Sequence, residues 1–131
     1  MRLLLDTSVL LDALRLRHGR RELLAELVRG QYTLVTSAPN VAEVYAGMRP
    51  SEEAETEAFL SALDCYEITA PVARLAGKLK NQWTGKGRTL SLADTIVAAV
   101  AMENDCAVMT DNEKDFTGLK FVNPIRAHRA D

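Results

Sequence analysis

Short apolar runs alternate with amphipathic segments along almost the whole chain, and this alternation limits the folds open to it. Strand-like runs are predicted at 2–6, 32–36, 65–69, 107–110 and 121–122, and helices at 7–17, 20–29, 38–48, 51–64, 71–79 and 91–104. Strands that are separated by helices pair in parallel through right-handed crossovers. The pattern therefore predicts a three-layer α/β/α sandwich with a parallel sheet of four or five strands.

Length and composition are those of an ordinary globular protein. The 131 residues are 47% hydrophobic and 26% charged, which favours a single domain over 1–131 with a normal core. A net charge of -2 excludes a strongly basic protein whose overall field holds nucleic acid. No stretch has the ~20 apolar residues of a membrane span, and no signal-peptide core is present, so we expect a cytoplasmic protein. Cys65 and Cys106 lack zinc-ligand spacing and are expected to be buried or half-buried thiols.

Four acidic residues lie at the ends of otherwise apolar segments: Asp6, Glu43, Asp94 and Asp115. A carboxylate beside a buried segment is unfavourable unless another group compensates its charge. Four carboxylates brought together would repel one another, and a hard divalent cation such as Mg²⁺ or Mn²⁺ relieves that repulsion. Ligands of open α/β sheets collect beyond the carboxyl ends of the strands, where Asp6 and the 111–115 segment are predicted to lie.

Each of these acids also has a purely structural interpretation. Asp6 can cap the helix that follows it, and Thr7 or Ser8 can orient its carboxylate through hydrogen bonds. Glu43 can be a solvated residue on the polar face of its helix. Asp94 can form a capping box with the serine three residues earlier, although its apolar helix predicts that it is buried.

The last acidic segment, TDNEKDF, offers two candidates. Asp111 is nearer the end of its strand, but Asp111 and Asn112 also suit simple turn chemistry. We favour Asp115 as the ligand, with Asp111 or Asn112 acting through water.

With these residues in place, the chain resembles the PIN-domain family, and specifically its VapC-type ribonuclease toxins. The resemblance covers nearly the whole chain and rests on four fragments in order: LLLDTSVLLD, VAEVYAG, LSLADTIVAAVA and VMTDNEKDF. It implies that Asp6, Glu43, Asp94 and Asp115 are the metal-binding and catalytic residues. The chain departs from the family at Asp111, which is acidic where relatives vary, so the identity of the last acid stays open.

The resemblance further implies a Mg²⁺- or Mn²⁺-dependent endoribonuclease that cuts RNA and blocks translation. It also implies a homodimer and a VapB-like antitoxin whose tail occupies the acidic pocket. No His, Lys or Ser lies in a motif suited to a nucleophile, so a metal-activated water is expected to attack the phosphodiester.

An acidic pocket repels RNA, so the residues that bind RNA must lie elsewhere. Two basic stretches are candidates for contacts with phosphate, and a tryptophan in the second could stack on a base. The alternative is that both are solvated helix faces and that the tryptophan packs in the core or at a dimer contact. The candidate residues are Arg15, Arg17, Arg20, Arg21, Lys80, Trp83, Lys86 and Arg88.

Three other classes of protein suit the sequence less well. A receiver-type phosphoacceptor needs an aspartate after a middle strand, where Ser37 follows YTLVT. A haloacid-dehalogenase-like phosphatase needs an aspartate two residues after Asp6, where Ser8 stands. A non-catalytic PIN-like module that acts only by binding protein is disfavoured because all four acids are present.

Overall fold

The computed structural model describes residues 1–87 and 90–112, together with the backbone of 121–122. Its strands form one five-stranded parallel sheet in the order β3-β2-β1-β4-β5. The predicted fold class and the parallel pairing are thereby confirmed. The strands are β1 (Arg2–Leu5), β2 (Thr33–Ser37), β3 (Asp64–Tyr66), β4 (Ala107–Met109) and β5 (Phe121–Val122).

The order of the strands places β1 at the centre of the sheet. Leu4 pairs with Val35 of β2 on one side and with Val108 of β4 on the other. The chain adds β2 and β3 in one direction and then returns past β1 to add β4 and β5. The carboxyl ends of β1 and β4 therefore flank a topological switch point, the position where open α/β sheets bind ligands.

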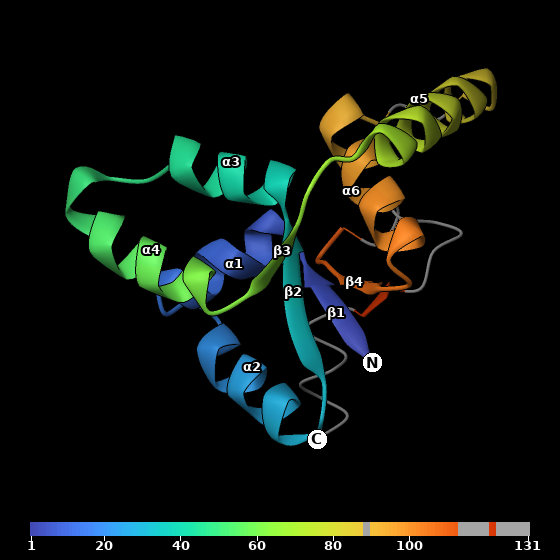
Figure 1. The fold of residues 1–131 in the computed structure, drawn as a ribbon. Coiled ribbons are helices and arrows are strands. Elements are labelled where there is room, and N and C mark those ends of the chain that lie inside the picture. Colours follow the sequence, from blue (N-terminus) through green and yellow to red (C-terminus); the bar gives the residue numbers. More distant parts are fainter. Residues whose placement is uncertain (88–89, 113–120, 123–131) are drawn as a thin grey trace.

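The described residues form six α-helices. These helices cover the two faces of the sheet (Figure 1). Helices α1 to α4 pack on one face, while α5 and α6 pack on the other and contact each other closely. A short 3-10 helix, Pro50–Glu52, precedes α4. The helices are α1 (Thr7–Leu14), α2 (Arg20–Arg29), α3 (Ala38–Ala46), α4 (Glu53–Ser61), α5 (Ala70–Gly85) and α6 (Leu92–Glu103).

Two hydrophobic cores form, one on each side of the sheet. Successive residues of a strand point to opposite faces, so Leu4 joins the α5/α6 core whereas Leu5 joins the core under α1 to α4. Val108 and Met109 divide in the same way on β4. Because β1 and β4 are buried on both faces, the polar residues that follow them start from well-fixed backbone positions.

Several predicted boundaries differ from those observed. Helix α1 ends at Leu14 and not near residue 17, because Leu16 and His18 adopt positive φ angles that a helix does not allow. Helix α5 continues to Gly85, beyond the predicted end at residue 79. Cys106 is buried as predicted, but Cys65 is exposed on the edge strand β3. Among the described residues, every helix is too short or too polar to span a lipid bilayer.

Candidate functional site

Asp6 occupies the end of the central strand and is almost completely buried, with 8% of its surface exposed. It is the N-cap of α1, and its Oδ1 accepts a hydrogen bond from the Thr7 N–H at 3.0 Å. The same oxygen accepts from Asn40 Nδ2 at 3.3 Å, while Oδ2 accepts from Thr110 Oγ1 at 2.8 Å. The capping role foreseen from the sequence is therefore present, and it leaves the carboxylate held from three directions.

Burial raises the pKa of Asp6 above that of an ordinary aspartate. The hydrogen bonds from Thr110 and Thr7 act in the opposite direction, while the negative charges of Asp94 and Glu43 raise the pKa further. Asp94 and Glu43 thus lie near enough to Asp6 for their charges to act on it. The three donors to Asp6 in the described part of the chain are neutral, so none of them supplies a compensating positive charge.

Glu43 lies on an exposed position of α3, but its side chain is held toward the end of β1. Thr7 Oγ1 donates a hydrogen bond to Glu43 Oε1 at 2.9 Å. The next residue along the helix, Val44, is buried in the core and fixes the orientation of α3. One threonine at the start of α1 therefore connects the first two predicted acids.

Asp94 lies in the first turn of α6, where the positive end of the helix dipole favours a carboxylate. Its N–H donates to the Oγ of the N-cap residue Ser91 at 3.0 Å. In the described part of the chain, the reciprocal bond of a capping box, from the Ser91 N–H to the Asp94 carboxylate, is not formed. Asp94 is half-buried, not buried as predicted, because the first turn of α6 also exposes Leu92.

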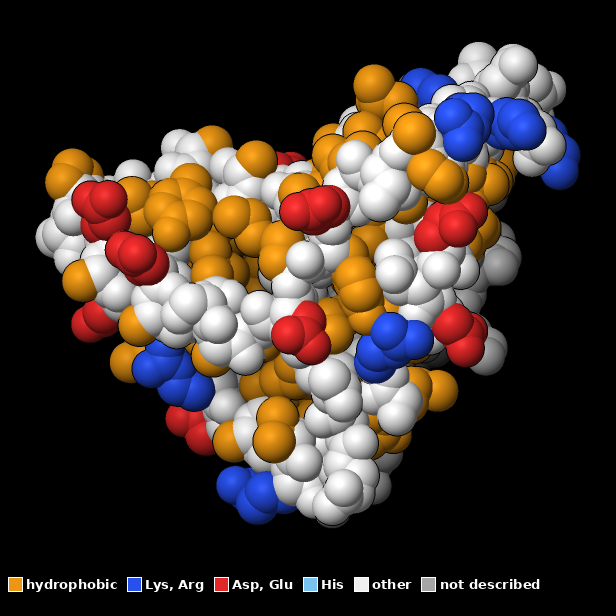
Figure 2. All heavy atoms as spheres, in the orientation of Figure 1, with side chains coloured by type: hydrophobic (Ala, Val, Ile, Leu, Met, Phe, Trp, Pro, Cys, Tyr) orange, Lys and Arg blue, Asp and Glu red, His pale blue; other side chains and the backbone are white. Residues whose placement is uncertain are grey.

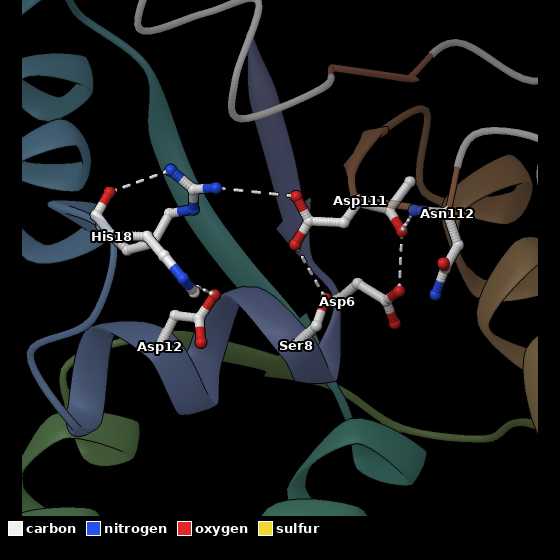
Figure 3. Close-up of polar contacts among 8 residues, drawn as sticks. Asp6, Ser8, Asp12, His18, Asp111 and Asn112 are labelled. Atoms are coloured by element: carbon white, nitrogen blue, oxygen red, sulfur yellow. Dashed lines mark hydrogen bonds and ion pairs between the residues drawn. The ribbon is translucent and has the colours of Figure 1, made fainter.

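Asp111 has a different environment from Asp6, although the two residues lie close together in Figure 3. Its carboxylate lies 3.6 Å from the guanidinium of Arg20 and accepts a long hydrogen bond, 3.4 Å, from Ser8 Oγ. Arg20 is only 6% exposed, and it also donates to the backbone carbonyl of His18 at 3.1 Å. A buried arginine therefore already neutralises this acid.

The predicted RNA-binding residues divide between surface and interior. Figure 2 shows basic side chains gathered at the far end of α5, and Lys86 there is exposed. Arg17 and Arg21 are exposed too, whereas Arg15 forms an ion pair with Glu52 at 3.5 Å.

Two of these residues are buried in the structure. Arg20 is buried against Asp111 and Trp83 is 7% exposed within the α5/α6 core, so neither presents a free surface to RNA. Lys80 is half-buried and donates to the carbonyl of Leu90. Arg88 and the predicted ligand Asp115 lie outside the described residues.

Two residues of the site were missed by sequence reasoning, Asn40 and Thr110. Both are completely buried and both bond to Asp6. The Oγ1 of Thr110 also accepts from the N–H of Asn112, so its own hydrogen is directed to the Asp6 carboxylate. The signal available in the sequence was a polar residue directly at a strand end or in the first turn of a helix.

The donor set suits a hard divalent cation, because Asp6, Glu43 and Asp94 offer only oxygen ligands and a net negative charge. Within residues 1–87 and 90–112, no three His, Cys, Asp or Glu side chains come close enough to ligate one metal ion together. Mg²⁺ retains several waters and is often held by one or two carboxylates, so this arrangement fits such an ion. Burial and the negative charges of Asp94 and Glu43 both disfavour the ionised form of Asp6, and a bound cation would stabilise that form.

The fold and this site define a class: a parallel α/β protein with a carboxylate-lined site at its switch point. The PIN domain family model matches residues 3–122 of the chain. The chain is 34% identical to Ribonuclease VapC19 of Mycobacterium tuberculosis over 121 residues, covering 92% of this chain and 97% of that protein. The protein therefore belongs to the PIN-domain family, and to its VapC members in particular.

Further comparisons agree with this assignment. Ribonuclease VapC10 of the same species is 28% identical over 130 residues, with 97% of both chains covered. The fold also matches that of a chain in the crystal structure of VapBC2 from Rickettsia felis bound to a promoter DNA fragment. That match has a TM-score of 0.80 at 21% identity and covers 94% of this chain and 98% of the other.

Proposed function

We propose that this protein is a metal-dependent endoribonuclease, the toxin of a toxin–antitoxin pair that acts on cytoplasmic RNA to block translation. The observation that carries the proposal is the buried Asp6 carboxylate at the switch point, on which the charges of Glu43 and Asp94 both act. The similarity along 92% of the chain to a protein named as a ribonuclease supports the same activity. The single domain over 1–131 carries this function as a whole.

Asp6, Glu43 and Asp94 are proposed to hold Mg²⁺ or Mn²⁺ partly through waters that the ion retains, with Asp115 completing the set. Asp111 is proposed not to be a direct ligand, because Arg20 and Ser8 already engage its carboxylate. Bound in this site, the cation would activate the scissile phosphate and the attacking water. Thr110, Asn40 and the Thr7 N–H hold Asp6 in place, so that its negative charge stays directed into the site.

RNA is proposed to bind through exposed basic residues outside the acidic site. Lys78 and Lys86 are exposed on α5 or directly after it, and α5 contains no acidic residue. Such contacts with phosphate are independent of sequence and weaken with salt. They would hold the backbone of RNA beside the site while the acids act on one phosphodiester.

The proposed partners are a second copy of the chain and a VapB-like antitoxin whose tail occupies the acidic pocket. Solved structures with this fold include VapBC2 from Rickettsia felis and VapBC-1 from nontypeable Haemophilus influenzae, whose names pair a VapC with a VapB. An antitoxin side chain with a positive charge would compensate the same carboxylates that a cation compensates.

The test is cleavage of total cellular RNA in Mg²⁺, in Mn²⁺ and in EDTA, followed by mapping of the new ends. Wild-type protein should cut in either metal and not in EDTA. Glu43→Gln should lose at least about 100-fold in rate, the scale expected for a group that acts on transition-state charge. Glu57→Gln, which changes an exposed glutamate of α4, is the matched control and should cut normally. Equal cleavage in EDTA, or none under any condition, would reject the proposal.

A further inference from the structure

Asn40 is a buried amide that connects two of the proposed metal-binding acids. It lies in the first turn of α3 and has no exposed surface. Its Nδ2 donates to Asp6 Oδ1 at 3.3 Å and to Thr7 Oγ1 at 3.0 Å. Its Oδ1 accepts a hydrogen bond from Ser37 Oγ, the N-cap residue of the same helix. One side chain on α3 therefore reaches across to the junction of β1 and α1.

The chemistry of the partners fixes the orientation of this amide. An ionised carboxylate only accepts hydrogen bonds, so the NH₂ group of Asn40 must face Asp6 and its carbonyl must face Ser37. The reverse orientation would place two acceptors against each other. Ser37, which makes no capping bond to the backbone of α3, instead donates its hydrogen to hold Asn40 in this orientation.

The same reasoning fixes the hydrogen of Thr7. Its Oγ1 accepts from Asn40 Nδ2, and its single hydroxyl hydrogen is donated to Glu43 Oε1 at 2.9 Å. The hydrogen bonds thus run in one direction, from Ser37 to Asn40, then to Thr7, and finally to Glu43. A branch from Asn40 ends on Asp6. The relay, meaning these hydrogen bonds from Ser37 through Asn40 and Thr7, thus has two branches, and each ends on a carboxylate.

We propose that Asn40 is a positioning residue that holds Asp6 and Glu43 in one arrangement for binding a divalent cation. This inference rests on the proposed function, because it assigns a role toward the same site. Groups that hydrogen-bond to metal ligands without contacting the metal orient those ligands, and removing such a group typically weakens metal affinity by 10- to 100-fold. A residue that served folding alone would lower stability and leave the affinity of the folded protein for metal unchanged.

The direct test is calorimetric titration of metal-free protein with Mn²⁺, at a temperature where each variant is folded. Asn40→Ala should bind Mn²⁺ about 10- to 100-fold more weakly than wild type. Asn104→Ala is the matched control, since Asn104 is a half-buried amide whose Nδ2 donates to the Val100 carbonyl at the end of α6. That control should lose stability in EDTA but bind Mn²⁺ with wild-type affinity. Wild-type affinity in folded Asn40→Ala would overturn the inference.

Two milder variants keep the inference testable if Asn40→Ala does not fold. Ser37→Ala leaves the amide in place but removes the hydrogen bond that orients it, so Mn²⁺ affinity should fall by less than in Asn40→Ala. Thr7→Val keeps the shape of the side chain and removes the hydroxyl that accepts from Asn40 and donates to Glu43. Residues on one network are non-additive, so the Ser37→Ala/Thr7→Val double variant should weaken binding by less than the product of the two single effects. Multiplying effects, or no effect in either variant, would overturn the inference.

Failure of this inference is distinguishable from failure of the proposed function. Wild-type protein that cleaves RNA in Mn²⁺ while the relay variants retain full Mn²⁺ affinity would overturn the role of Asn40 alone. Mn²⁺ binding that depends on Asn40, in a protein that cleaves no RNA, would support the relay and overturn the ribonuclease proposal. Wild-type protein that binds no Mn²⁺ would overturn both.

Discussion

Asp6 and Asp111 are two carboxylates beyond the carboxyl ends of β1 and β4, and their surroundings differ in burial and in charge. Among the described residues, Asp6 is buried and receives only neutral donors, whereas the Asp111 side chain is about one-third exposed and faces the buried guanidinium of Arg20. Hydrogen bonds from neutral groups hold a carboxylate in place without cancelling its charge. The contrast indicates that the Asp6 carboxylate has no counter-charge among the described residues, while Asp111 already has one within the fold.

The largest effect that this comparison predicts is on catalysis. Asp6→Asn should reduce metal-dependent RNA cleavage by more than about 100-fold, beyond the scale of a residue that only supports a ligand. Asp111→Asn should retain most of the activity, because its charge is used by Arg20. Initial rates on one labelled RNA in Mn²⁺ measure both. A loss in Asp111→Asn equal to that in Asp6→Asn would place Asp111 among the ligands.

The second prediction concerns the buried guanidinium of Arg20. Arg20→Met replaces the guanidinium by an apolar side chain of similar length and should lower the free energy of unfolding by about 1–3 kcal/mol. This is less than for a fully buried pair, because water reaches Asp111. The control is Arg21→Met, at an exposed neighbour on α2, which should change stability by less than about 0.5 kcal/mol. Urea unfolding in EDTA measures both, and weakened Mn²⁺ binding in Arg20→Met would contradict the division of roles.

The third prediction is a dependence on pH. The pKa of Asp6 is raised in the folded state, so between the ordinary aspartate pKa and the raised value the folded protein binds more protons than the unfolded chain. Metal-free wild type should therefore lose stability as the pH rises through this interval. Asp6→Asn does not titrate there, so its melting temperature relative to wild type should rise with pH in EDTA. A difference that stays constant or falls would mean that burial does not destabilise the Asp6 carboxylate.

Much of the fold could be predicted from the sequence, because it depends on local patterns. The observed α2 has the predicted bounds, since its apolar stripe and the following Gly30 define it locally. Asp6, which directly follows an apolar strand, was proposed from the sequence together with Glu43 and Asp94, whose charges act on it in the structure. Arg20 appeared to belong to a basic surface cluster, and its burial depends on a partner at the end of β4, a distant part of the sequence. The roles of Asn40 and Thr110 were not predicted either, because both depend on a hydrogen bond to Asp6, which is distant from them in the sequence.

The smallest predicted effect is at Ser8, whose bond to Asp111 is long and whose partner is accessible to water. Ser8→Ala should lower the free energy of unfolding by less than about 1 kcal/mol, because a weak and solvated hydrogen bond contributes little. Ser61→Ala, which removes an exposed serine hydroxyl bonded to the Ala58 carbonyl, is a matched control with a similarly small loss. Mn²⁺ affinity measured on Ser8→Ala is the sharper readout. If Asp111 is held by Arg20 and serves the fold, that affinity stays at the wild-type value; if it falls, Ser8 and Asp111 act on the cation together with Asp6.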